Sequence, residues 1–92
     1  MTIEEKDFQL IPIDESSGSF DLKLLYKIQP RGKESRLEFK NVAYGISLAR
    51  AVNRIANFRV NQKHKDEAIT LITYFKELKE EIDSLKKSLE LI

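Results

Sequence analysis

The sequence has no cysteine among its 92 residues, which excludes disulfide bonds, thiolate zinc sites and cysteine nucleophiles. It has no run of about 18 apolar residues, so no membrane-spanning helix is predicted. The first residues are acidic and lack the apolar segment of a secretory signal peptide. These absences favour a cytoplasmic protein with no membrane partner.

Side chains for catalysis are equally scarce. His64 is the only histidine and stands in a lysine-rich segment, so neither a serine–histidine–acid triad nor a two-histidine metal site can be built. Ser16, Ser17 and Ser19 surround Gly18 without the lysine and spacing of a phosphate-binding loop. We therefore predict that the protein is not an enzyme and has no catalytic residue, cofactor site or metal site.

Charge is plentiful but unevenly distributed. Charged residues make up 34% of the chain and hydrophobic residues 41%, which is typical of one small globular domain spanning residues 1–92. The net charge is +1, yet residues 20–63 carry ten basic residues against three acidic ones. This basic middle segment is the electrostatic feature that points most directly to a partner.

The first half of the chain predicts antiparallel strands within residues 7–44. From Phe20 to Ile28 apolar and polar residues alternate, as in a strand with one buried face. Pro30 and Gly32 then predict a turn, and a return strand is expected over residues 34–44, ending at Gly45. Residues 7–13 are β-prone but contain a proline, which favours a short edge strand.

Two helices are predicted after the strands. Ser47 is a suitable N-cap for a short helix over residues 47–58, and a long helix is expected over residues 66–92, starting near two acidic residues. The expected order is β-β-β-α-α, and the fold class is α+β: a small antiparallel sheet with a long amphipathic C-terminal helix.

The long helix carries a heptad pattern. Its apolar residues follow alternating steps of four and three, at Leu71, Phe75, Leu78, Ile82, Leu85, Leu89 and Ile92. We expect the first two to close the protein's own small core. The remaining five, Leu78, Ile82, Leu85, Leu89 and Ile92, are predicted to form a homodimer or partner interface, either as a coiled coil or against the helix of another protein. In a parallel dimer, Glu81 of one chain would face Lys86 of the other.

The basic hairpin offers a second candidate site. Its cations are Lys23, Lys27, Arg31, Lys33, Arg36 and Lys40. The two lysines of the first strand and Arg36 and Lys40 of the second are expected to point outward, with Arg31 and Lys33 at the tip, so that the hairpin forms a surface that contacts phosphates. The alternation places Tyr26 and Phe39 on the apolar face, which argues against base stacking. The alternative is a solvated face whose charges discourage edge pairing.

Residues 41–55, N-V-A-Y-G-I-S-L-A-R-A-V-N-R-I, resemble a family of small phage and prophage proteins. The shared pattern is N-[IV]-[AG]-Y-x-x-[ST]-L-x-x-A, matched here by Asn41, Tyr44, Ser47, Leu48 and Ala51, with Gly32-Lys33 matching the hairpin tip. Gly45 departs from the aromatic residue common at that position. The resemblance implies a hairpin-plus-helices fold and a phage or mobile-element setting, with no established activity. The four residues 45–48 also resemble the strand-to-helix junction of PC4-like single-stranded-DNA-binding coactivators.

Two hypotheses follow. The first is a non-enzymatic phage or mobile-element accessory protein that acts as a homodimer by binding a host or phage protein, in host takeover or anti-defence. The second is a nucleic-acid-binding module, for single- or double-stranded DNA, that uses the basic hairpin.

Overall fold

A computed structural model describes residues 2–14, 18–28, 31–32 and 34–90. The chain divides into two compact units, which we call the β unit (Met1–Ala51) and the helical unit (Val52–Ile92). Each unit is described by itself below. Within the described residues, no helix is both long enough and apolar enough to cross a membrane.

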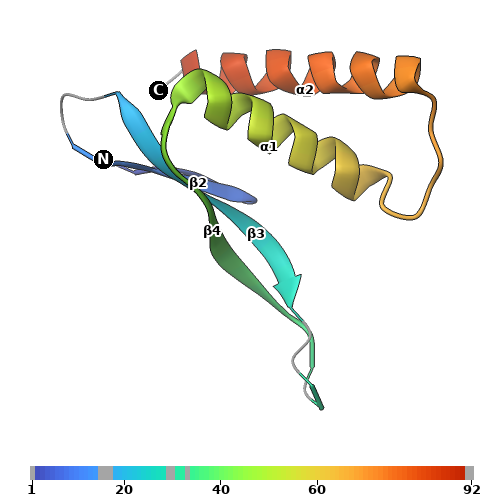
Figure 1. Cartoon of the computed structure of the whole chain (residues 1–92), viewed down its shortest axis with the longest axis horizontal. Helices are drawn as coiled ribbons and strands as arrows, with labels where there is room; N and C mark the ends of the chain where they lie inside the picture. Colours follow the sequence, from blue (N-terminus) through green and yellow to red (C-terminus); the bar gives the residue numbers. More distant parts are fainter. Residues whose placement is uncertain (1, 15–17, 29–30, 33, 91–92) are drawn as a thin grey trace. The chain divides into compact units, whose positions relative to one another are not determined.

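The β unit is a four-stranded antiparallel sheet in which strands adjacent in the sequence are also adjacent in the sheet (Figure 1). The strands are β1 (Ile3–Glu5), β2 (Phe8–Pro12), β3 (Ser19–Ile28) and β4 (Arg36–Ser47). The predicted α+β class and antiparallel hairpin are confirmed. The sequence analysis did not predict β1, and because β1 covers one side of β2, the expectation that β2 is an edge strand was wrong.

One face of the sheet holds its buried side chains. Directly paired residues of antiparallel strands point to the same face, and the register pairs Phe8 with Leu24 and Leu10 with Leu22. All four side chains are buried. The alternation seen in β3 therefore does define a core face, as the sequence predicted.

β4 is bent rather than ended at Gly45. The register between β3 and β4 shifts twice near Leu22, and Gly45 lies at one of these bulges with a φ of 61°. The Gly45 N–H donates to Asp21 Oδ1 at 3.0 Å, which satisfies a donor that the bulge removes from the strand ladder. The strand continues to Ser47, whose Oγ accepts from the Arg50 N–H at 3.3 Å, confirming Ser47 as an N-cap.

Both helices have boundaries that differ from the prediction. Helix α1 (Leu48–Lys63) runs five residues past Phe58, because Val60 continues the buried spacing of Val52 and Ala56. Helix α2 (Leu71–Glu90) begins later than residue 66. Thr70 is its N-cap, with Oγ1 accepting from the Thr73 N–H at 3.2 Å.

Candidate functional site

Ion pairs join α1 and α2 within the helical unit. Lys63 Nζ lies 3.0 Å from Glu77 Oε1, and Arg59 Nη1 lies 3.6 Å from Glu81 Oε2. Four residues back along α1 correspond to four residues forward along α2, so the two helices are antiparallel. One further turn brings Ile55 level with Leu85, and both side chains are buried. Charged contacts therefore join one end of the pair, and buried apolar side chains lie toward the other.

His64 completes the charged end. Its Nδ1 lies 2.9 Å from Glu67 Oε2, and its Nε2 contacts the Glu77 carboxylate. Carboxylates close to both ring nitrogens favour the protonated imidazole, because a charged ring can donate from each nitrogen. The carboxylates of Glu67 and then Glu77 accordingly raise the pKa of His64. Lys63, followed by His64, lowers the pKa of Glu77.

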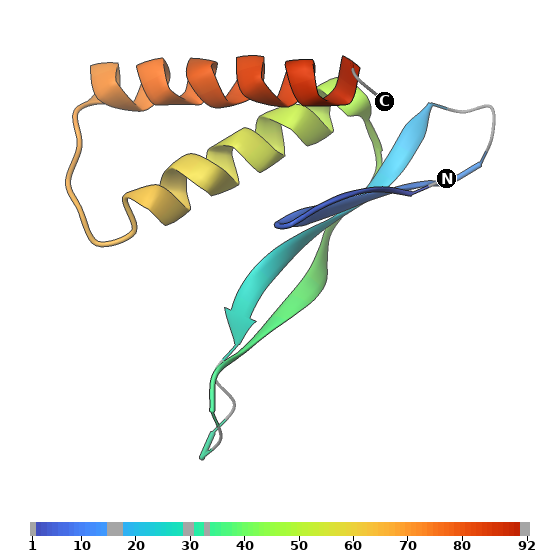
Figure 2. The same ribbon diagram turned by 180° about the vertical axis from the view of Figure 1, so that it is seen from behind.

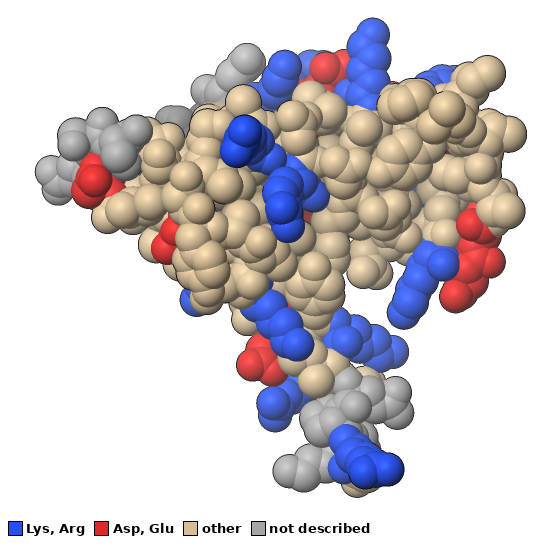
Figure 3. Space-filling model, in the orientation of Figure 1, with Lys and Arg blue, Asp and Glu red and all other residues tan. Residues whose placement is uncertain are grey.

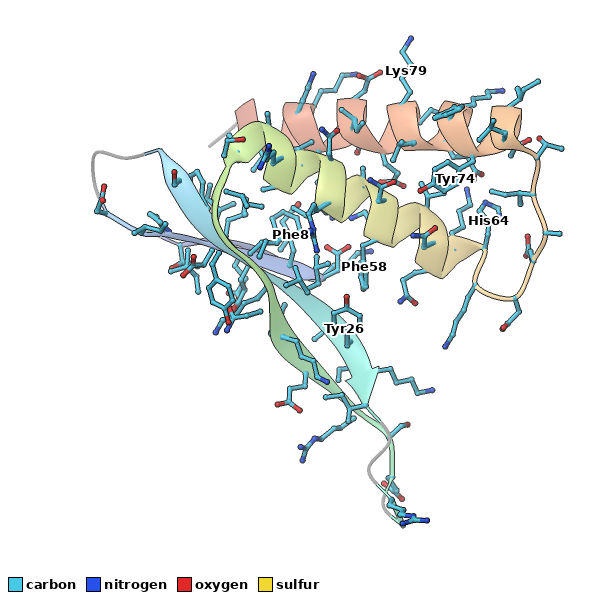
Figure 4. The ribbon with its side chains drawn as sticks, in the orientation of Figure 1. Phe8, Tyr26, Phe58, His64, Tyr74 and Lys79 are labelled. Atoms are coloured by element: carbon cyan, nitrogen blue, oxygen red, sulfur yellow. The ribbon has the colours of Figure 1, made fainter. Side chains whose placement is uncertain are left out.

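A contact between neutral side chains is made three residues before Glu77 in α2. The Tyr74 hydroxyl donates to Asn57 Oδ1 at 2.6 Å, and Asn57 Nδ2 donates to the Asn53 carbonyl at 2.9 Å. Figure 4 shows Tyr74 and His64 on the side of α2 that faces α1. The sequence analysis missed this network, because helical spacing placed both asparagines on a polar face with no assigned contact.

The heptad residues of α2 are exposed at the opposite end from the one predicted. Leu71 and Phe75, expected in the core, are 67% and 58% exposed, and Ile72 beside them is 82% exposed. Leu85, expected at an interface, is 1% exposed. The reason is that α1 packs against the flank of α2 that bears Glu77 and Glu81, not along the heptad line.

The other predicted interface residues are partly covered. Leu78, Ile82 and Leu89 are half-buried, and Ile92 lies outside the described residues. Glu81, which a parallel coiled-coil dimer would pair with Lys86 of a second chain, is paired with Arg59 of its own chain. The structure thus removes part of the charge complementarity on which that dimer prediction depended.

The basic hairpin does not form one cationic face. The register pairs Lys27 with Leu37 and Leu25 with Phe39, so these residues and Lys23 share one face of the sheet. It pairs Ile28 with Arg36 and Leu24 with Lys40, which places those two cations on the opposite face. The expectation that the four strand cations share the outward face was wrong, because the alternation within each strand does not specify the register between them.

The same register places Phe39 on the opposite face from Tyr26, whereas the sequence analysis placed both on the apolar face. Phe39 lies on the face that carries Lys23 and Lys27, whereas Tyr26 lies on the other face, opposite Glu38. The Arg36 guanidinium is 3.4 Å from the Glu38 carboxylate, so one cation of that second face is partly neutralised. Lys33 lies outside the described residues, and Arg31 is exposed at the tip.

The hairpin projects from the sheet as a two-stranded arm, which we call the hairpin arm (described residues 26–28, 31–32 and 34–38). β2 pairs with β3 only between Phe20 and Leu24, whereas the pairing of β3 with β4 continues to Ile28. Figures 1 and 2 both show this hairpin extending beyond β2. Lysine and arginine side chains are distributed along it, with acidic atoms among them (Figure 3).

A cavity of about 520 Å³ lies at the turn between β2 and β3. Its lining residues are Thr2, Ile11, Pro12, Asp14, Gly18, Ser19 and Phe20. Among its described lining residues, Asp14 supplies a carboxylate and Thr2 and Ser19 supply hydroxyl groups. In the part of the chain that the structure describes, no group of three or more histidine, aspartate or glutamate side chains is placed to hold a metal ion.

Comparisons with protein-family models, with characterised proteins and with solved structures each returned no match.

Proposed function

We propose that the protein acts by binding another protein, and that the α2 apolar patch, formed by Leu71, Ile72 and Phe75, is part of the interface. The observation that carries this proposal is the exposure of three large apolar side chains within two turns of one helix. Covering such side chains yields about 25 cal/mol per Å² of apolar area removed from water. Clustered exposed apolar residues are typical of interaction surfaces.

The arrangement of the patch supports an ordered binding surface. Thr70 caps the first turn of α2, and the rings of Tyr74 and Phe75 meet edge to face with centroids 6.3 Å apart. Tyr74 is in turn held by Asn57. Phe75 is thus presented from a fixed helix turn, and a rigid aromatic side chain is a favourable anchor for a partner.

The resemblance at residues 41–51 supports a phage or mobile-element setting, in which such an accessory protein would bind a host or phage protein for takeover or anti-defence. A homodimer is one form of the proposed assembly. It would use the α2 apolar patch rather than Leu85, which is already buried.

Affinity capture from the source cells tests the proposal. We expect Leu71→Asp/Phe75→Asp to lose the partners that the wild-type chain retains, because two charges would have to be desolvated at the interface. Thr73→Asp/Ser84→Asp adds the same charge at exposed positions of α2 outside the patch and serves as the matched control. Equal capture by both double variants would refute the proposal.

The second candidate function is binding of double-stranded DNA, and the observation that favours it is the hairpin arm. A two-stranded β-ribbon fits the major groove, whose walls carry phosphates on both sides. Lys27 and Arg36 lie on opposite faces of the arm, and Arg31 lies at its tip. Cations on both faces of the arm suit the two phosphate walls of a duplex groove. Single-stranded nucleic acid would lie across one face and contact only the cations there.

A titration with duplex and single-stranded oligonucleotides across salt concentrations tests this candidate. If the arm enters a groove, Lys27→Ala and Arg36→Ala should each weaken duplex binding and each reduce the salt slope by about one. Lys76→Ala and Lys87→Ala on α2 are the controls. Absence of duplex binding at low salt would eliminate the candidate.

A further inference from the structure

Four heptad residues of α2 form a continuous line that α1 does not fully cover. They are Leu71, Phe75, Leu78 and Ile82, of which the first two are exposed and the last two half-buried. The eleven residue steps from Leu71 to Ile82 extend about 16 Å along the helix. Alternating steps of four and three keep all four side chains on one narrow stripe, which is the arrangement that receives the knobs of another helix.

The two borders of this stripe differ in charge. On the border next to α1 lies Glu81, with Glu77 further round the helix on the same side, and both are engaged by cations of α1. On the opposite border lie Ile72, Lys79 and Lys86, seven residues apart and therefore nearly in line along the helix. All three are exposed.

The lysines of the outer border are available to a partner. Figure 4 shows Lys79 pointing away from α1. Among the side chains that the structure describes, neither Lys79 nor Lys86 has an ion-pair partner. Asp83 follows Lys79 by one turn but lies further from the stripe, at about 100° of rotation per residue. The border that bears Lys79 and Lys86 therefore presents positive charge next to the apolar stripe.

We infer that the stripe receives an amphipathic helix of another protein whose apolar face is bordered by acidic residues. This inference rests on the proposed function and specifies the partner. The charges favour such a helix over a second copy of this chain. An antiparallel second copy would set Lys79 and Lys86 against the same lysines, and a parallel one would set Lys86 against Glu81, which Arg59 already holds.

Fluorescence anisotropy with two labelled synthetic peptides tests the inference on the full chain. Both peptides have leucine at positions a and d over about three heptads, and the residues at e and g are glutamate in one and lysine in the other. The wild-type chain should bind the glutamate peptide at least about tenfold more tightly, since complementary charge favours one partner and like charge opposes the other.

Charge-reversal variants locate the effect. Lys79→Glu/Lys86→Glu should lose the preference for the glutamate peptide, whereas Lys76→Glu/Lys87→Glu, which makes the same change in net charge at positions of α2 further from the stripe, should keep it. Equal binding of the two peptides by the wild-type chain, or equal effects of the two variants, would overturn the inference. So would self-association of the chain that excludes both peptides.

The two proposals fail in different ways. If cellular partners are captured through the α2 apolar patch but neither peptide binds, protein binding stands and the acidic helix is wrong. If Leu71→Asp/Phe75→Asp leaves capture unchanged, the proposed function itself is wrong.

Discussion

At the residue scale, Leu85 and Phe75 occupy core positions of the same heptad pattern but have different surroundings. Leu85 is 1% exposed and lies level with Ile55, whereas Phe75 is 58% exposed. We expect Leu85→Ala to lower the free energy of unfolding by about 2–5 kcal/mol, because it leaves a cavity between packed side chains. Phe75→Ala should change it by about 0.5 kcal/mol or less. Urea denaturation followed by circular dichroism measures both, and equal losses would show that the burial pattern is wrong.

A comparison of Gly45 with Gly32 separates the cost of a close side-chain contact from the cost of the backbone conformation. Both have positive φ, 61° and 73°, where an L side chain costs about 1–2 kcal/mol. A Cβ at position 45 would lie 3.3 Å from Ile13 Cδ1, whereas one at position 32 would meet nothing within 4 Å. Gly45→Ala should therefore be the more destabilising substitution, measured by thermal unfolding. A larger effect at position 32 would contradict the bulge geometry.

At the element scale, the contact between α1 and α2 has a predictable pH dependence. Glu67 and Glu77 raise the pKa of His64 above 6.5, so its contribution to stability is complete below pH 6.5 and is lost as the pH rises through the folded-state pKa. Lys63 and His64 lower the pKa of Glu77 below 4.5, so its contribution is complete above pH 4.5 and is lost on acidification. The charged end of the helix pair is therefore strongest between about pH 4.5 and 6.5.

Replacement of the histidine checks this window. The wild-type chain should lose stability as the pH rises from 6 towards 9, and His64→Gln should remove that part of the decline, because glutamine does not titrate. Urea midpoints measured at several pH values, with Lys65→Gln as the control on the same connector, follow the effect. An unchanged slope in His64→Gln would show that the imidazolium does not support the helix pair.

Local patterns in the sequence predicted the helices and strands better than the side-chain contacts between segments. Alternation in β3 and the capping side chain of Ser47 depend on neighbours along the chain, and both expectations were confirmed. The predicted start of α2 was too early, because the negative charges of Asp66 and Glu67 suit the first turn of a helix. The cap is instead made by the hydroxyl of Thr70. Glu67 contacts His64, three residues earlier within the connector.

The candidate sites were harder to predict because they depend on register. A bulge or a one-residue slip between β3 and β4 decides whether Lys27 and Arg36 share a face, and no pattern within either strand specifies it. In the same way, heptad spacing identified the stripe on α2. It did not show that α1 would take the flank bearing Glu77 and Glu81 and leave Phe75 exposed.

At the scale of the whole molecule, the exposed features fall on separate units. The β unit carries the hairpin arm, with cations on both faces, and the helical unit carries the α2 apolar patch and its border of lysines. Each unit thus offers one surface, and the nucleic-acid and protein-binding hypotheses can be tested independently by substitutions in different parts of the chain.

The central claim is that the α2 apolar patch is a protein interface, and photo-cross-linking in the source cells tests it most directly. Benzoylphenylalanine at position 75 should give a discrete cross-linked product of higher mass, and the same group at position 87, on the far side of α2, should give little. Equal cross-linking at the two positions, or none at position 75, would contradict the account.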